Sequence, residues 1–193
     1  MKGSSTLKKD IVKQVMDGIK QATKKEVLIG IPATEAERKS DAGGAVNNAM
    51  LGYTHEYGDP LRRIPARPWL RPSIDSIRPS ATAQLKSGLE QALAGKGHPE
   101  AAERALNVVG MMGVAAAKNR IRNKIAPGLA KATLEARLAR KQGSGIRINK
   151  GAKAELALRA LDPSVGRSME FTTPLIDTGE MIRAINYVVR DKK

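Results

Sequence analysis

YTHEYGDPLRRIPARPWLRP, residues 53–72, is the stretch from which the fold prediction starts. Its first five residues continue a helix that begins near residue 46. Gly58 and Pro60 end this helix, because glycine adopts positive φ at little cost and proline cannot continue the ladder of backbone hydrogen bonds. Three further prolines bias the residues that precede them toward extended backbone. Residues 64–71 are therefore predicted to be β or polyproline II, which makes the segment stiff.

Arginines and aromatic rings recur along this stretch, and the only tryptophan of the chain, Trp69, lies between two of the arginines. One interpretation is structural: Trp69 fills the core and the arginines are solvated. The other is a protein interface, because a rigid segment that carries arginines and a large ring loses little entropy when it docks. Both can hold at different residues. The candidate interface residues are Tyr53, Tyr57, Arg62, Arg63, Arg67, Trp69 and Arg71.

The composition favours helices, because only 3% of the residues are aromatic and the core must be built from Ala, Leu, Ile, Val and Met. Another helix runs from about 74, with a kink or a new start at Pro79. Two short β-rich runs predict strands over 26–31 and 185–190, which most simply lie in one sheet. The expected fold is α+β, with several helices packed on a small, mainly antiparallel sheet and with extended loops. Apolar spacing and end signals predict the remaining helices over 6–24, 46–57, 99–125, 133–141, 153–161 and 178–184.

Local patterns add detail to these elements. Gly110 and Gly113 permit another backbone to approach the 99–125 helix closely, and Asp177 or Thr178 can cap the 178–184 helix. Residues 142–151, QGSGIRINKG, predict a mobile loop or a small hairpin, because glycine lies on both sides of a short apolar run. One side of the 46–57 helix carries Val46, Ala49, Met50 and Tyr53.

The length of 193 residues corresponds to one domain, 1–193, with room for a single core. The 34 Lys+Arg against 19 Asp+Glu give a net charge of +15, which points to a polyanionic neighbour such as nucleic acid or an acidic protein surface. The charge is uneven, because residues 117–150 hold ten basic residues and a single acidic one, Glu135.

The chemistry-bearing residues do not form a catalytic pattern. There is no cysteine, so disulfides and thiolate metal sites are excluded. No nucleophile elbow, phosphate loop or zinc-binding His-Glu-x-x-His is present, and His55 and Glu56 lie about 100° apart on a helix with no third orienting group. We therefore expect no enzyme, no catalytic residue, no cofactor and no metal. No apolar run approaches the ~18 residues of a membrane span and no signal peptide is evident, so we expect a soluble protein made in a reducing cytoplasm.

Three segments carry a resemblance to a known family. YTHEYG followed by RIPARPWLRPSI resembles the small head–tail connecting proteins of long-tailed bacteriophages, also described as tail-component, virion-morphogenesis, neck or tail-completion proteins. Residues 174–185, PLIDTGEMIRAI, resemble the closing Thr-Gly turn and short helix of that family. Between them, residues 132–137, ATLEAR, lie where the family often has a Thr-x-x-x-Arg helix start.

The resemblance implies a structural virion protein of the phage neck or tail top, made in the host bacterial cytoplasm. Such proteins commonly form closed rings, often hexamers, that join the head connector to the tail tube and complete the tail. The expected partners are further copies of the chain, a head-completion or connector protein, and a tail terminator or tail tube protein, with no membrane. The terminal strand is a candidate for pairing across subunits, and residues 143–171, longer than the corresponding family link, are expected to be an inserted loop or flexible arm.

In such a ring, part of the basic excess would face the lumen, where genomic DNA passes and non-specific contact is weak and salt-dependent. The candidate lumen or DNA-facing residues are Lys118, Arg120, Arg122 and Lys124, which alternate along a helix end and therefore lie around the helix and not in one stripe. Two alternatives stay open. One is a free, non-enzymatic nucleic-acid-binding protein that uses residues 117–150, and the other is an assembly chaperone that leaves before the particle matures.

Overall fold

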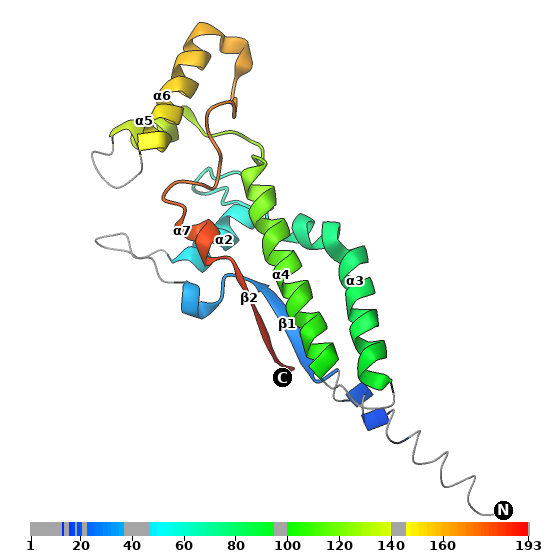
Figure 1. The fold of residues 1–193 in the computed structure, drawn as a ribbon. Coiled ribbons are helices and arrows are strands. Elements are labelled where there is room, and N and C mark those ends of the chain that lie inside the picture. Colours follow the sequence, from blue (N-terminus) through cyan, green and yellow to red (C-terminus); the bar gives the residue numbers. More distant parts are fainter. Residues whose placement is uncertain are drawn as a thin grey trace, which may run out of the picture.

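The computed structural model confirms an α+β fold, with six α-helices and a two-stranded antiparallel sheet among the described residues. Figure 1 shows three layers, in which α4 lies between α3 on one side and the sheet on the other. The described residues are 13, 16–17, 19–20, 23–36, 47–94, 100–139 and 146–192. Most of the predicted 6–24 helix lies outside them.

The sheet joins the two ends of the chain, as predicted. β1 (Lys25–Gly30) pairs antiparallel with β2 (Asn186–Asp191), and Leu28 lies opposite Val188. Each strand is shifted by one residue from its predicted bounds. One face of the sheet packs on α4, whereas Leu28 and Val188 are exposed on the other face.

Small residues let α4 (Glu100–Arg122) pack closely on both neighbours. A Cβ at Gly110 would overlap the ring of Tyr187 in β2, and one at Gly113 would overlap the side chain of Ile29 in β1. On the opposite side, a Cβ at Gly88 of α3 would overlap Ala105. Side chains of the sheet, and not another backbone as predicted, therefore approach Gly110 and Gly113 closely, and α4 is the centre of the fold.

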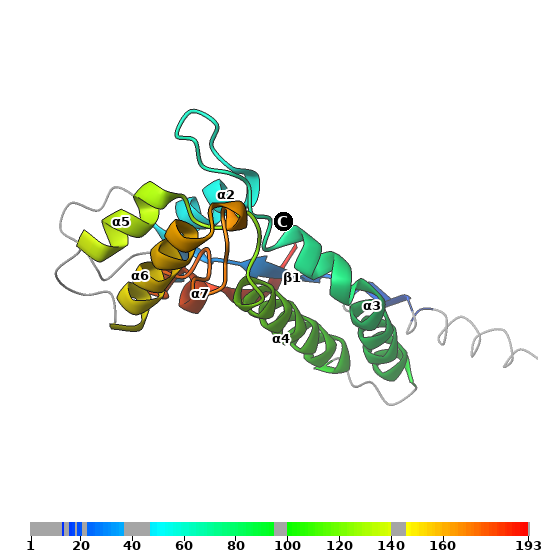
Figure 2. The same cartoon turned by 90° about the horizontal axis from the view of Figure 1, so that it is seen from above.

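Helix α3 (Arg71–Leu93) is one continuous helix with Pro79 inside it, so no new helix starts at Pro79. Figure 2, a view from above, shows it alongside α4. The extended segment before it ends at Trp69, two residues earlier than predicted, because Leu70 is already in the right-handed helical region and Pro72 fits the first helical turn.

Helix α2 (Asn48–Tyr57) turns a different side to the core from the one that its apolar residues indicate. Its N-cap is Asn47, whose side chain accepts a hydrogen bond from Met50 N at 2.8 Å. Met50 and Tyr53 are 47% and 69% exposed, whereas the buried residues are Asn48, Gly52 and Glu56. Burial of this polar side depends on hydrogen-bond partners elsewhere in the chain.

Near the C-terminus, the short helix α7 (Glu180–Ala184) packs against α2. The N-cap of α7 is Gly179, at φ 79°, in place of Asp177 or Thr178, and Thr178 Oγ1 accepts only a long hydrogen bond of 3.4 Å from Glu180 N. The main core is formed by Trp69, Ala117, Ile121, Ile125, Met181, Ile182 and Ile185.

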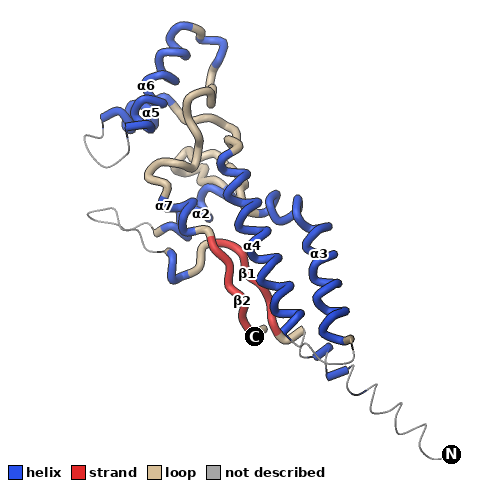
Figure 3. The backbone as a smooth tube through the Cα atoms, viewed as in Figure 1, coloured by secondary structure: helices blue, strands red, loops and turns tan. Residues whose placement is uncertain are grey.

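A second, smaller core lies in a lobe beyond the C-terminal end of α4 (Figure 3). Helices α5 (Lys131–Ala139) and α6 (Ile146–Leu161) pack on one another around Leu129, Leu134 and Ala152. The prediction of a loop or hairpin over 142–151 is wrong from Ile146 onward, where the chain is helical. Residues 143–171 are thus not simply an inserted loop: from Ile146 they form a helix and a short 3-10 turn, η2 (Pro163–Val165), and the helix has its own packed face.

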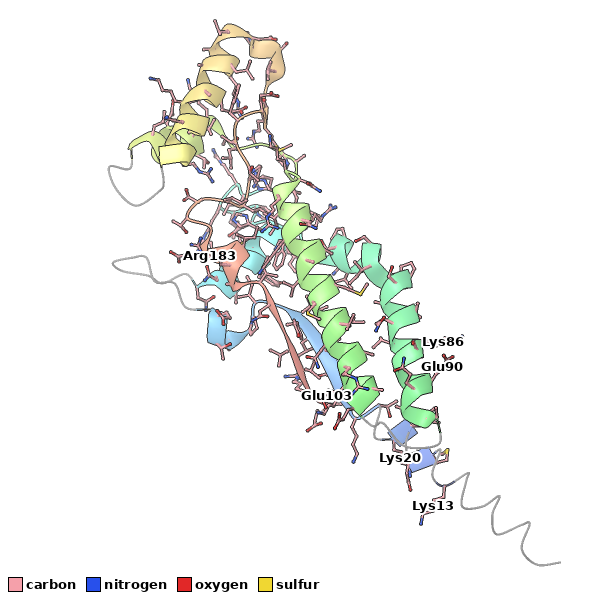
Figure 4. All side chains as sticks on the ribbon, viewed as in Figure 1. Lys13, Lys20, Lys86, Glu90, Glu103 and Arg183 are labelled. Atoms are coloured by element: carbon pink, nitrogen blue, oxygen red, sulfur yellow. The ribbon has the colours of Figure 1, made fainter. Side chains whose placement is uncertain are left out.

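Several ion pairs lie on the outer surface. Figure 4 shows Lys86 and Glu90 projecting from α3, and Glu103 at the start of α4. Lys86 Nζ lies 3.9 Å from Glu90 Oε1, and Lys25 Nζ lies 2.7 Å from Glu103 Oε2. Exposed pairs of this kind contribute about 0–1 kcal/mol each. In the part of the chain that the structure describes, no helix is long and apolar enough to cross a membrane.

Candidate subunit interface and basic groove

Glu56 joins α2 to the beginning of α3. Its Oε2 accepts hydrogen bonds from the backbone N–H groups of Trp69 at 2.7 Å and Leu70 at 2.8 Å, and its Oε1 accepts one from Arg71 N at 2.9 Å. The N-cap residue of α3, Leu70, supplies no side-chain cap. A buried carboxylate therefore satisfies N–H groups at a helix N-terminus, where the helix dipole favours negative charge. We call this arrangement the Glu56 cap.

Trp69 is a core residue, with 3% of its surface exposed. Its Nε1–H donates to the carbonyl of Gly52 at 2.9 Å, and a Cβ at Gly52 would lie 3.2 Å from the indole. Gly52 thus leaves the space into which the ring packs. The structural interpretation of Trp69 is confirmed, and burial removes it from the candidate interface.

Arg67 is also buried, with 5% exposed, although it was a candidate interface residue. Its Nε donates to the carbonyl of Pro127 at 2.7 Å and its Nη2 to that of Gly128 at 3.2 Å. Burial, followed by the nearby charges of Arg167 and Arg137, lowers the pKa of Arg67 from its usual value. Arg67 therefore fixes the linker that leads from α4 to the lobe and is not available to another subunit.

The remaining aromatic candidates form an exposed platform. The rings of Tyr53 and Tyr57 are 4.8 Å apart between centroids, and the guanidinium of Arg71 lies 5.8 Å from the centroid of Tyr57. The three side chains border a groove of about 500 Å³ whose lining includes Ile31 and Ile74. We call these three residues and the groove the tyrosine platform.

Arg62 and Arg63 lie on the loop between α2 and α3, which projects from the body in Figure 2. A β-bridge between Asp59 and Ile64 closes the loop. Leu61 in this loop is 97% exposed. Sequence reasoning missed Leu61, although an apolar residue beside Pro60 in a turn was a usable signal. Both arginines are exposed and stay candidates for an interface.

The three segments that carry the family resemblance meet around one cavity of about 230 Å³. His55 of α2, Arg137 of α5 and Asp177 of the C-terminal turn line it, and Arg137 Nε lies 3.6 Å from Asp177 Oδ1. Desolvation, followed by the charge of Arg67, lowers the pKa of His55 to about 4, so the imidazole is neutral at pH 7. His55 Nδ1 has no hydrogen-bond partner among the described residues.

The four basic residues predicted to face DNA do not form one surface. Lys118 lies on the side of α4 opposite Arg120, since two residues turn a helix by about 200°. Arg122 is exposed and donates to Asn119 Oδ1 at 3.4 Å. Only Arg120 and Lys124 line a common groove, of about 610 Å³, which we call the basic groove.

Comparison of the chain with protein-family models, with curated proteins and with solved structures gives no match. Among the described residues, no three acidic or histidine side chains come close enough together to hold a metal ion.

Proposed function

We propose that this chain is a structural, non-enzymatic subunit of the neck or tail top of a long-tailed phage. In this proposal it forms a ring, most simply a hexamer, that joins the head connector to the tail tube and completes the tail. Its neighbours are then other copies of the chain, a head-completion or connector protein, and a tail terminator or tail tube protein.

The observation that carries the proposal is the convergence of the three resembling segments. The first segment is closed on itself by the Glu56 cap, and the second and third are joined by the pair of Arg137 and Asp177. The residues on which the resemblance rests are thus residues that hold distant parts of the chain together. Agreement at such positions supports a shared fold more strongly than agreement at exposed positions would.

The tyrosine platform supports a role in assembly. Exposed tyrosines beside an arginine, over a groove with apolar lining, have the composition of the energetically important centre of many interfaces. Contacts in a ring are head-to-tail, so the surface that binds the platform is a different part of the neighbouring copy. The two-stranded sheet, with an exposed apolar pair at Leu28 and Val188, is a second candidate contact.

The test is quantitative mass spectrometry of purified particles, with the copies of this chain counted against the major capsid protein. A fixed count of about six or twelve copies is the expected result. Absence from mature particles would refute the structural role and leave the assembly chaperone. Light scattering on the purified chain, alone and with particle lysates, separately reports ring formation.

A free nucleic-acid-binding protein is the second candidate, and the basic groove is the observation that favours it. This alternative predicts a monomer or dimer that binds DNA tightly in low salt and is missing from particles. Particle counting and light scattering therefore distinguish the two.

A further inference from the structure

The basic groove lies between the first turn of α3 and the C-terminal end of α4. Pro68, Pro72 and Ser76 contribute one wall. The other wall comes from α4 and the residues that follow it, and includes Asn119, Arg120, Asn123 and Lys124.

The two cations of the groove are held in place by main-chain carbonyl groups. Arg120 Nε donates to the carbonyl of Pro68 at 2.8 Å, and Lys124 Nζ donates to that of Glu170 at 2.9 Å. Neither Nη atom of Arg120 is hydrogen-bonded to a described residue, so donors remain for a ligand. Because both side chains are already ordered, a ligand that binds them causes little further loss of side-chain entropy.

The groove is suited to an anion. None of the described residues that line it is acidic, whereas the groove beside the tyrosine platform contains Glu56 and Asp75. Asn119 and Asn123 add side-chain amides, and Arg, Lys and Asn are the side chains that commonly contact nucleic-acid phosphates. The net charge of +15 attracts polyanions from a distance.

We propose that the basic groove contacts the phosphate backbone of duplex DNA, with Arg120 and Lys124 as the phosphate-binding cations. The groove has no aromatic residue on which a base could stack, so the contact is to the backbone and independent of sequence. Two cations give a weak contact that lets DNA slide. The inference rests on the proposed function for the source of the DNA, which passes through the ring.

The experiment measures binding of the full-length chain to a fluorescent 25-base-pair duplex by anisotropy, as a function of salt. Two groove variants, Lys124→Gln and Asn123→Asp, each lower the net charge by one. Two control variants, Lys86→Gln and Gln91→Glu, both in the second half of α3 and away from the groove, change the charge equally. Circular dichroism verifies that all four are folded.

For Lys124→Gln, the slope of log K (the association constant) against the logarithm of salt concentration should become less negative by about 0.9, since one phosphate contact is removed. Asn123→Asp weakens binding at least as much, because it places a carboxylate in the groove. Both controls keep the wild-type slope. Arg120→Lys is expected to bind more tightly than Arg120→Gln, since it keeps the charge.

Three results would overturn the inference: equal losses in all four charge variants, no duplex binding in 50 mM salt, or tighter groove-dependent binding of poly-glutamate than of DNA. The last would reassign the groove to an acidic protein. Inorganic phosphate that binds in the groove while the duplex does not would reduce the site to a free-anion site. Particle counting is independent of these outcomes, so failure of the groove and failure of the neck proposal can be told apart.

Discussion

Two buried glutamates organise two regions of this molecule in different ways. In the α2–α3 region, Glu56 accepts three backbone N–H groups, and the charge that it meets is the positive end of a helix. In the lobe, Glu155 is fully buried and pairs with Arg159 of the same helix, while its other oxygen accepts from Phe171 N at 3.0 Å. Arg159 in turn donates to the carbonyl groups of Leu129 and Ser168, on the two linkers that reach the lobe.

The two regions differ in what a single substitution leaves behind. The Glu56 cap contains one formal charge, and its partners are backbone N–H groups that a substitution to alanine does not remove. The Glu155–Arg159 pair contains two charges, and loss of Arg159 leaves the fully buried Glu155 carboxylate without its countercharge. The lobe should therefore be the more sensitive of the two regions to a single substitution, although its apolar core is the smaller.

The largest expected effect is that of Arg159→Ala. This change leaves the Glu155 carboxylate buried and unpaired, and breaking a buried pair in this way costs about 3–5 kcal/mol. Because Arg159 also holds both linkers, we expect the lobe to open while α4 stays folded. Hydrogen exchange checks this: amide protection should be lost in α5 and α6 and retained in α4. Uniform loss of protection along the chain would show that the lobe is not a separate unit.

A smaller effect is expected for Glu56→Gln. The amide keeps the shape of the carboxylate but removes the charge and one acceptor, so charge-assisted bonds worth about 1.5–3 kcal/mol each are weakened or lost. Since the Glu56 cap adjoins Trp69 in the main core, the whole unfolding transition should move to lower urea concentration. The matched control is Glu90→Gln, an exposed residue of α3 that should leave the midpoint unchanged. Equal midpoints for the two variants would contradict the importance of the cap.

His55 gives a pH test of the same region. Its pKa is lowered to about 4 in the folded chain, so between pH 6.5 and 4 the unfolded chain binds a proton that the folded chain does not. The free energy of unfolding should therefore decrease as the pH is lowered through this window, by at most about 1.4 kcal/mol per pH unit from this group. Above pH 6.5 the histidine is neutral in both states, so this destabilising effect of His55 should vanish. The free energy of unfolding, measured by urea titration at several pH values, should depend more steeply on pH in the wild type than in His55→Asn. Parallel curves would mean that His55 does not titrate as expected.

The sequence predicts the elements better than it predicts which side of each is buried. The two strands and most helix bounds follow from local patterns, and the fold class was predicted correctly. The buried side of α2 was not, because burial of Glu56 depends on N–H groups 13 to 15 residues later in the chain. The helical start of α6 at Ile146 was also missed: the sequence around it contains glycines that locally favour a turn, whereas the helix packs through Ala152 against Leu134 of α5.

The same limit applies to the candidate site. Seven residues of one stretch were predicted as an interface, and the structure divides them by burial alone. Arg67 and Trp69 are inside, where they fix the linker and fill the core, and the other five are exposed. Sequence spacing could not make this division, since Arg67 and Arg71 are both arginines next to a proline and differ only in what surrounds them.

Replacement of both Tyr53 and Tyr57 by alanine should have the smallest effect on stability. It is also the sharpest test of the exposed candidate interface residues. These side chains are 69% and 54% exposed, so we expect the unfolding free energy to change by about 0.5–1 kcal/mol at most. Assembly should nevertheless be lost, because exposed aromatic residues supply much of the energy of an interface. Light scattering of the purified variant and its copy number in particles measure this directly, with Met111→Ala, at 54% exposure on α4, as the control. If the tyrosine variant still assembles in wild-type amounts, the subunit contact lies elsewhere, and the exposed face of the sheet becomes the surface to alter next.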